Sequence, residues 1–213
     1  MKTCILMGGG ASVKEGIDLG LWEQIKDKEV WSINFAFMTM PFLPKRELWI
    51  DFSFFRNNID RLQLLYLQGV PCYARKHNKY AYITEINQLD ITRDPKEIDK
   101  KIFSGRMGLS GIFALSLAVK EQYEVIYLLG YDFGSITNDK NTHYYQDKLN
   151  VMSSGFGKPE LYKENNNIKK EIEDFMLFIK PNIKIINVSP KSNIPYFEKI
   201  DYTTFFERIA NEV

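Results

Sequence analysis

Three consecutive glycines follow the first apolar run of the chain, where a ligand-binding turn would need them. Gly8, Gly9 and Gly10 come directly after Thr3–Met7, and glycine lets a backbone approach a ligand closely and adopt left-handed angles. Free N–H groups in such a turn form a concavity that binds anions, with the hydroxyl of Ser12 beside it. The third glycine of the dinucleotide fingerprint is missing, and no Gly-Lys-Ser/Thr follows, so the turn predicts a phosphate or nucleotide only in general terms.

Polar side chains also follow later apolar runs. Asn34 and Asp51 each end such a run, where an amide or carboxylate can hydrogen-bond a base or a ribose hydroxyl. Both residue types also cap loops and helix starts, so the two interpretations stay open. Ser110 and Gly111 open an apolar segment that indicates a buried helix, and a helix N-terminus presents unpaired N–H groups.

Further candidates lie in the second half of the chain. Asp132 and Phe133 follow an apolar run, where an acid and a ring can hold a ribose and stack on a base; core packing is the alternative for the ring. His143 lies in a polar segment and is either a general base or acid or a structural loop residue. His77 indicates a solvated basic loop. The sequence shows neither metal-ligand spacing nor a G-x-S-x-G nucleophile motif.

Alternating strands and helices must position these residues. The apolar patterns predict strands over 3–7, 29–34, 47–51, 70–74, 124–129 and 182–188, a small extra strand over 79–84, and helices over 19–26 (capped by Asp18), 52–67, 109–120, 168–179 and 203–210. Such alternation implies a single α/β domain over 1–213, with a mostly parallel sheet flanked by helices. Segments 85–104 and 134–157 are expected to be loops or a lid. Ligands of such sheets bind at the carboxyl ends of the strands.

Composition excludes several classes of protein. Lys and Arg total 28 and Asp and Glu total 27 in 213 residues, so the strong basic excess typical of nucleic-acid binding is missing and no nucleic-acid partner is expected. With 45% hydrophobic residues the chain is not a disordered one. Cys4 and Cys72 indicate reduced core thiols, and no apolar run approaches the ~20 residues that span a bilayer. A cytoplasmic protein is expected.

Six short stretches, in order and over nearly the whole chain, resemble the motifs of the bacterial sialyltransferases that use CMP-sialic acid. They also resemble a related Rossmann-like family of phage and bacterial proteins and, more distantly, an archaeal pterin pyrophosphokinase. The stretches are Gly8-Gly9-Gly10-Ala11-Ser12-Val13-Lys14, Ile33-Asn34-Phe35, Ile50-Asp51-Phe52-Ser53, Leu109-Ser110-Gly111-Ile112, Ile126–Gly134 and Thr142-His143-Tyr144.

This resemblance implies a Rossmann-like domain with a pocket for the nucleotide of an activated donor of CMP type. Its nucleotide-binding positions correspond to Gly8, Gly9, Gly10, Asn34, Asp51, Ser110, Gly111, Asp132 and Phe133. It also implies an inverting transfer to an acceptor at the anomeric carbon of the sugar, with no metal or other cofactor required. In the family a general base deprotonates the acceptor hydroxyl, and tyrosines help the phosphate to leave. A homo-oligomer is compatible with the sequence.

The sequence departs from the family pattern mainly on the sugar side. Asp147 stands at the position of the general-base histidine, Gly134 at that of a tyrosine, and Gly9 at that of an asparagine. Met107 replaces an arginine, with Arg106 next to it. A different nucleotide-activated donor, or binding without transfer, therefore fits better than CMP-sialic acid as donor.

Three functions follow as hypotheses. In a glycosyltransferase, Asp147 or His143 is the base, and Tyr144, Tyr145 and Arg106 contact phosphate or sugar. A nucleotide-binding module without turnover, such as a phage protein that sequesters or senses a nucleotide, is the second. The third is a pterin-type phosphotransferase, which would hold a metal-bound triphosphate with carboxylates from Asp51, Asp132, Asp139 and Asp147.

Overall fold

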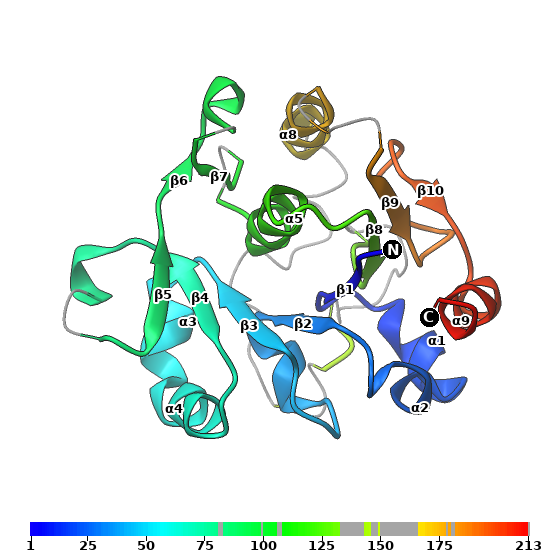
Figure 1. Cartoon of the computed structure of the whole chain (residues 1–213), viewed down its shortest axis with the longest axis horizontal. Coiled ribbons are helices and arrows are strands. Elements are labelled where there is room, and N and C mark those ends of the chain that lie inside the picture. The colour runs from blue at the N-terminus through cyan, green and yellow to red at the C-terminus, as the bar shows by residue number, and fades with distance from the viewer. Residues whose placement is uncertain are drawn as a thin grey trace.

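An eight-stranded sheet runs through the molecule, with strand order β10-β9-β8-β1-β2-β3-β4-β5 (Figure 1). The computed structural model describes residues 1–80, 83–98, 100–105, 108–132, 143–145, 149, 166–177, 179 and 182–212. All strand pairs described in this sheet are parallel. The strands are β1 (Thr3–Met7), β2 (Val30–Ile33), β3 (Arg46–Trp49), β4 (Cys72–Arg75), β5 (Ile86–Leu89), β8 (Val125–Leu129), β9 (Lys184–Asn187) and β10 (Glu198–Lys199).

Helices cover both faces of this sheet, as the sequence predicted (Figure 1). One face carries α5 (Ser110–Lys120) and α8 (Asn166–Met176), beside a small sheet of β6 (Ile91–Thr92) and β7 (Ile102–Phe103). The other face carries α1 (Val13–Asp18), α2 (Leu21–Ile25), α3 (Phe52–Asn57), α4 (Ile59–Leu67) and α9 (Tyr202–Ala210). Three 3₁₀ turns complete the described elements: η1 (Asn34–Met38), η2 (Asn78–Tyr80) and η3 (Pro95–Glu97). None of the helices described is long and apolar enough to cross a membrane.

Burial on both faces explains why the central strands are apolar runs rather than alternating ones. All five residues of β8 are buried, and so are Cys4–Met7 of β1. α5 is apolar almost all round and is accordingly packed between the sheet and the small β6–β7 sheet.

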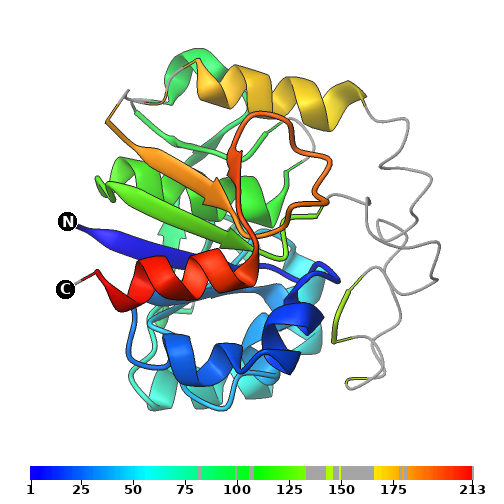
Figure 2. The ribbon, with the colours of Figure 1, turned by 90° about the vertical axis from the view of Figure 1, so that its right-hand side faces the viewer.

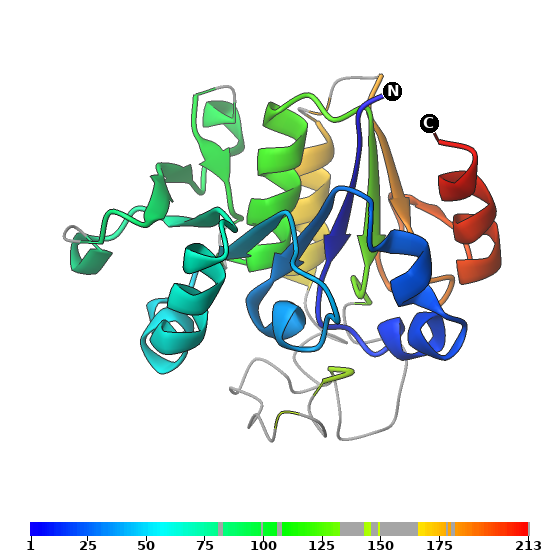
Figure 3. The same cartoon turned by 60° about the horizontal axis from the view of Figure 1, so that its bottom comes forward.

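The direction of strand order reverses between β1 and β8. From β1 the chain adds β2, β3, β4 and β5 on one side, and β8, β9 and β10 on the other. In doubly wound sheets a ligand binds outside the carboxyl ends of the strands at this reversal. Both chain termini lie close together at the opposite, amino-terminal edge of the sheet (Figures 2 and 3).

Two helices predicted from the sequence differ in the structure. The helix predicted over 19–26 is α2, which begins at Leu21 and ends at Ile25. The chain is helical up to Asp18 and again from Leu21, because Gly20 adopts a left-handed φ of 86° between them; Asp18 therefore ends α1 and caps nothing. The helix predicted over 52–67 is interrupted at Asn58, whose side-chain amide donates to the carbonyl of Phe54 at 2.8 Å.

Segments expected to be irregular also contain regular structure. The predicted strand over 79–84 is wrong, because Asn78–Tyr80 is a 3₁₀ turn and the edge strand is β5. Segment 85–104 was expected to be a loop or lid, but it contains β5, η3 and the small sheet of β6 and β7. Segment 134–157 lies outside the described residues, except for 143–145 and 149.

Candidate functional site

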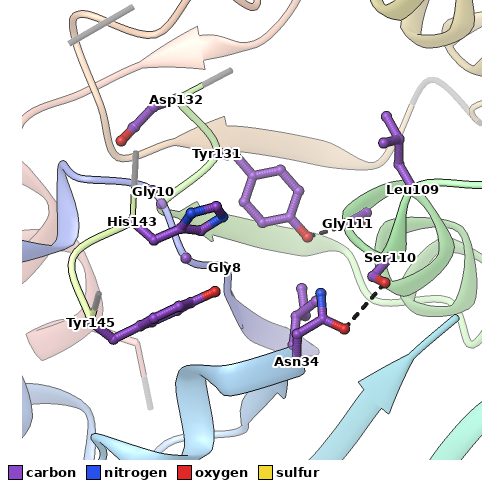
Figure 4. A pocket seen from close by; sticks show the side chains of 13 residues that line it. Gly8, Gly10, Asn34, Leu109, Ser110, Gly111, Tyr131, Asp132, His143 and Tyr145 are labelled. Atoms are coloured by element: carbon purple, nitrogen blue, oxygen red, sulfur yellow. Dashed lines mark hydrogen bonds between the residues drawn. The ribbon is translucent and has the colours of Figure 1, made fainter. Parts of the chain in front are cut away.

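A cavity of about 190 Å³ opens where the strand order reverses, between the turn after β1 and the N-terminus of α5 (Figure 4). Its walls come from four stretches of chain: the glycine turn, the end of β2, the start of α5 and the segment after β8. A fifth, the short segment 143–145, lies over the glycine turn. The lining residues are Gly8, Gly9, Gly10, Ile33, Asn34, Leu109, Ser110, Gly111, Gly130, Tyr131, Asp132, His143 and Tyr145.

The glycine turn is tied to the end of β8. Gly8 N–H donates to the carbonyl of Leu129 at 2.7 Å, and Gly10 N–H donates to the carbonyl of Gly130 at 3.0 Å. The expectation of a turn with free N–H groups is therefore wrong for these two residues. The glycines are needed for close approach instead: a Cβ at Gly10 would lie 2.5 Å from both Gly130 O and Asp132 Oδ2.

Asp132 fixes this turn from the other side. Its Oδ2 accepts a hydrogen bond from Ser12 N–H at 2.7 Å, and the residue is 5% exposed. Burial raises the pKa of the Asp132 carboxyl, and hydrogen bonds from Ser12 and Ser189 oppose that rise. Ser12 itself is not among the residues that line the cavity.

The segment His143–Tyr145 packs on the glycine turn. His143 forms an antiparallel bridge with Gly10, and Tyr144 N–H donates to the carbonyl of Gly9 at 3.0 Å. The rings of His143 and Tyr145 stack with centroids 5.3 Å apart, and both line the cavity (Figure 4). A Cβ at Gly9 would lie 2.5 Å from His143 Cδ2 and from the Tyr145 hydroxyl. The rings thus occupy the space that an asparagine at position 9 would need.

The ionisation of these side chains follows from burial. Burial lowers the pKa of His143 below its ordinary value, which makes the imidazole neutral near pH 7 and able to accept a proton. Tyr144 points elsewhere, because its hydroxyl is hydrogen-bonded to Thr39 Oγ1 at 2.7 Å. Burial raises the pKa of Tyr144 to about 12. Of the two tyrosines expected at the phosphate, Tyr145 lines the cavity and Tyr144 does not.

Ser110 connects three elements at the cavity wall. Its hydroxyl donates to Asn34 Oδ1 at 3.3 Å and accepts from the backbone N–H of Ile50 at 3.3 Å (Figure 4). This bond engages the Asn34 oxygen and leaves its amide nitrogen as a donor at the cavity. The interaction joins the end of β2, the end of β3 and the start of α5.

The first turn of α5 supplies backbone donors, which Gly8 and Gly10 of the glycine turn do not. Leu109 precedes the helix in extended conformation, and no side chain caps the helix. Within the described part of the chain, the N–H groups of Ser110, Gly111 and Ile112 have no hydrogen-bond partner. A helix N-terminus of this kind carries a partial positive charge and attracts anions.

Comparisons with known proteins identify the fold. No family model and no curated protein matches the sequence. Among solved structures, the sialyltransferase CstII from Campylobacter jejuni with the substrate analogue CMP-3FNeuAc is 16% identical over 94% of this chain and 86% of its own, with a TM-score of 0.55. A CstII variant in complex with CMP is 17% identical over the same shares, with a TM-score of 0.57. The monofunctional α-2,3-sialyltransferase Cst-I of C. jejuni is 16% identical over 91% and 78%, with a TM-score of 0.56.

The chain has the fold of these sialyltransferases. The resemblance suggested by six short stretches is thereby confirmed at the level of the fold, and so is the Rossmann-like α/β class. The structure brings nine of the predicted site residues together around the cavity. They are Gly8, Gly9, Gly10, Asn34, Ser110, Gly111, Asp132, His143 and Tyr145.

Other predicted site residues lie elsewhere. Asp51 directly precedes α3 and does not line the cavity; partial burial raises the pKa of its carboxyl, and the Arg75 guanidinium opposes that rise. Phe133, Asp147 and Arg106 lie outside the described residues. Among the residues described, no group of three or more His, Cys, Asp or Glu side chains could hold a metal ion.

Four residues that line the cavity were not predicted as site residues: Ile33, Leu109, Gly130 and Tyr131. Tyr131 is 4% exposed, and its hydroxyl donates to the carbonyl of Gly111 at 3.1 Å, which ties the segment after β8 to α5. Gly130 has a φ of 71°, and a Cβ there would lie 2.8 Å from Gly10 N. A glycine immediately after the apolar run of β8 was the sequence signal for this close approach.

Proposed function

We propose that this protein is a glycosyltransferase that uses a CMP-type nucleotide sugar as donor. The observation that carries the proposal is the position of the cavity. It lies at the strand-order reversal and is faced by the open N-terminus of α5, in a fold whose solved examples include complexes with CMP.

Donor binding in this proposal depends on local groups rather than on bulk charge. The formal net charge of the chain is only +1, which gives little long-range attraction for an anionic nucleotide. The N–H groups of Ser110, Gly111 and Ile112 would receive the phosphate. The amide of Asn34 would donate to an oxygen or nitrogen acceptor of the nucleoside, next to the ring of Tyr145.

The transfer itself requires a base and a leaving group. The acceptor hydroxyl attacks the anomeric carbon, the bond from that carbon to the phosphate oxygen breaks, and CMP leaves with the bonding electrons. The hydroxyl proton passes to a ring nitrogen of His143, which is neutral and lines the cavity. The Tyr145 hydroxyl can donate to the departing phosphate. We assign this role to His143, which lines the cavity, while Asp147 lies outside the described residues.

Ligand-induced stabilisation tests the binding half of the proposal. The midpoint of thermal unfolding is measured with CMP, UMP, GMP, ATP and CMP-sialic acid, each with and without Mg²⁺. CMP at 100 times its Kd should stabilise the protein by about 2.7 kcal/mol, and Asn34→Ala should shrink this shift more than the exposed control Lys26→Gln. The absence of a shift with any nucleotide would reject the proposal.

Turnover separates the transferase from its alternatives. His143→Gln should lower kcat by a factor of about 100 or more while the Kd for CMP stays within a factor of about two. Stabilisation by CMP without donor hydrolysis would support a binding module without turnover. That reading gains from Tyr144, whose hydroxyl is engaged by Thr39 and is not offered to a phosphate. A strictly Mg²⁺-dependent shift would support the phosphotransferase.

A further inference from the structure

Segment 143–145, which carries the histidine assigned as base, is held between two parts of the fold. On one side is the glycine turn, where Gly10 bridges to His143 and the carbonyl of Gly9 accepts from Tyr144 N–H. On the other side is η1, the 3₁₀ turn that begins at the cavity wall. The hydrogen bond to this second side joins Tyr144 to Thr39, and neither residue lines the cavity.

The direction of this hydrogen bond follows from the other contact of the threonine. Thr39 caps the C-terminal end of η1, and its Oγ1 donates to the carbonyl of Ala36 at 2.9 Å. A threonine hydroxyl has a single hydrogen, so in the 2.7 Å contact between the two hydroxyls Tyr144 is the donor and Thr39 the acceptor. The Tyr144 hydroxyl is therefore bound to an acceptor that is itself fixed to the backbone of η1.

Ring contacts hold the segment at the same place. Tyr144 is partly buried and packs against the hydrophobic cluster that includes residues of β1 and α9. Its ring lies 5.1 Å from that of Tyr145, which lies 5.8 Å from the ring of Phe35 in η1. The opposite neighbour of the Tyr145 ring is the His143 imidazole, with which it stacks at the cavity (Figure 4). A continuous set of contacts thus runs from η1 to the imidazole.

Tyr144 is thereby fixed at both ends, by its backbone N–H and by its hydroxyl, and His143 is the next residue in the chain. We propose that Tyr144 and Thr39 are positioning residues, whose hydrogen bond holds the His143 imidazole over the glycine turn, where it can take the proton of the acceptor hydroxyl. This inference rests on the proposed function for the reaction, but not for the position of the ring.

The position of the ring can be followed without any ligand. Burial lowers the pKa of His143, so an imidazole released from the glycine turn should titrate closer to the ordinary histidine value. Tyr144→Phe and Thr39→Val each remove the hydrogen bond and should raise the pKa of His143, measured by NMR of its ring protons. Thr39→Ser keeps the hydroxyl and should leave this pKa as in wild type. Tyr66→Phe, at a tyrosine 43% exposed, is the matched control, and His77, the other histidine of the chain, gives reference signals in every spectrum.

Turnover tests what the position of the ring is for. Tyr144→Phe should lower kcat by a factor of about ten, the effect of one hydrogen bond. The Kd for CMP should change by less than a factor of about three, because the N–H groups at the start of α5 are untouched. In the His143→Gln background, Tyr144→Phe should lower kcat by less than a factor of about two, since the side chain that it positions is already gone. Thr39→Ser should keep the wild-type kcat, and Thr39→Val should not.

Two results would overturn the proposal. One is an unchanged titration of His143 in a folded Tyr144→Phe variant, and the other is a loss of kcat from Tyr144→Phe that is as large in the His143→Gln background as in wild type. If Tyr144→Phe does not fold, Thr39→Val is read by the same criteria. A wild-type protein that binds CMP but transfers no sugar would reject the proposed function, and the titration would still decide whether Tyr144 and Thr39 hold the ring.

Discussion

A methyl group at residue 9 or 10 would meet different neighbours. At Gly9 it would lie 2.5 Å from two side-chain atoms, His143 Cδ2 and the Tyr145 hydroxyl, which can move. At Gly10 it would lie 2.5 Å from the backbone carbonyl of Gly130, which is fixed by the strand it follows. Neighbouring glycines of one turn therefore have separate roles, one in the cavity and one in the fold.

We expect this difference to appear when each glycine is changed to alanine. Gly10→Ala should destabilise the protein by about 1–3 kcal/mol, with a fall of roughly 2–4 °C in Tm for each kcal/mol. Gly9→Ala should displace the ring pair, lowering CMP affinity about tenfold with a smaller change in Tm. Calorimetry of unfolding and of CMP binding measures both. Equal losses of Tm in the two variants would contradict the separate roles given to Gly9 and Gly10.

Glu47, a buried residue of β3, predicts a pH dependence of stability. Burial raises the pKa of its carboxyl well above the ordinary value, against the opposing hydrogen bond from Ser32. Above the ordinary glutamate pKa of about 4.3, the unfolded chain releases this proton while the folded chain keeps it, so rising pH removes stability until the folded pKa is reached. Glu47→Gln lacks this proton.

The difference in stability between Glu47→Gln and wild type is the quantity to measure. The free energy of unfolding of Glu47→Gln should rise relative to that of wild type as pH rises from 4 toward 7, by up to about 1.4 kcal/mol per pH unit. Urea unfolding at several pH values gives this difference, and the other titrating groups cancel in it. Parallel stability curves would show that Glu47 titrates normally.

At the scale of elements, the Ser110 hydroxyl links the start of α5 to the ends of β2 and β3. Ser110→Ala would remove the acceptor for the buried N–H of Ile50 and the donor to Asn34. We expect a loss of about 1–3 kcal/mol of stability and a CMP affinity about five- to tenfold weaker. Ser110→Thr keeps the hydroxyl and serves as the control in both assays. Wild-type CMP affinity in Ser110→Ala would show that the Ser110 hydroxyl does not contribute to CMP binding.

Some elements could be predicted residue by residue from the sequence, and others could not. The strand predicted over 3–7 is β1 itself, because a continuous apolar run between polar and glycine residues is typical of a strand buried on both faces. β5 was missed because Ile86–Leu89 includes Asn87 and Gln88 and has no clear alternation. It lies at the sheet edge and is defined by its backbone pairing with β4.

The candidate site divides in the same way. Asn34 and Ser110 were predictable, because each stands where an apolar pattern begins or ends. The packing of His143 on Gly9 and the hydrogen bond from Ser32 to Glu47 were not, since no local pattern reports a contact between distant segments. The bound N–H groups of Gly8 and Gly10 likewise depend on β8, more than 110 residues away in sequence.

At the scale of the whole molecule, the last helix completes one of the cores. Phe205 of α9 is 0% exposed, and its ring lies 4.9 Å from that of Tyr127 in β8. Phe205→Ala should therefore lower the free energy of unfolding by about 3–5 kcal/mol. The neighbouring Phe206 is only partly buried, and Phe206→Ala should cost clearly less. Urea unfolding of both variants tests this, and equal losses would place α9 outside the cooperative core.

The reversal of strand order between β1 and β8 also decides when the cavity can exist during synthesis. β1 emerges from the ribosome first, but its partner on the cavity side is made more than 115 residues later. A nascent chain can build β1 to β5 early, yet it carries no complete binding site until Tyr145 has left the exit tunnel. Such distant pairings form slowly. A ligand needs the complete site, so it can speed neither the early pairings nor the closure of β8 onto β1. It can only stabilise the folded chain once that closure has occurred.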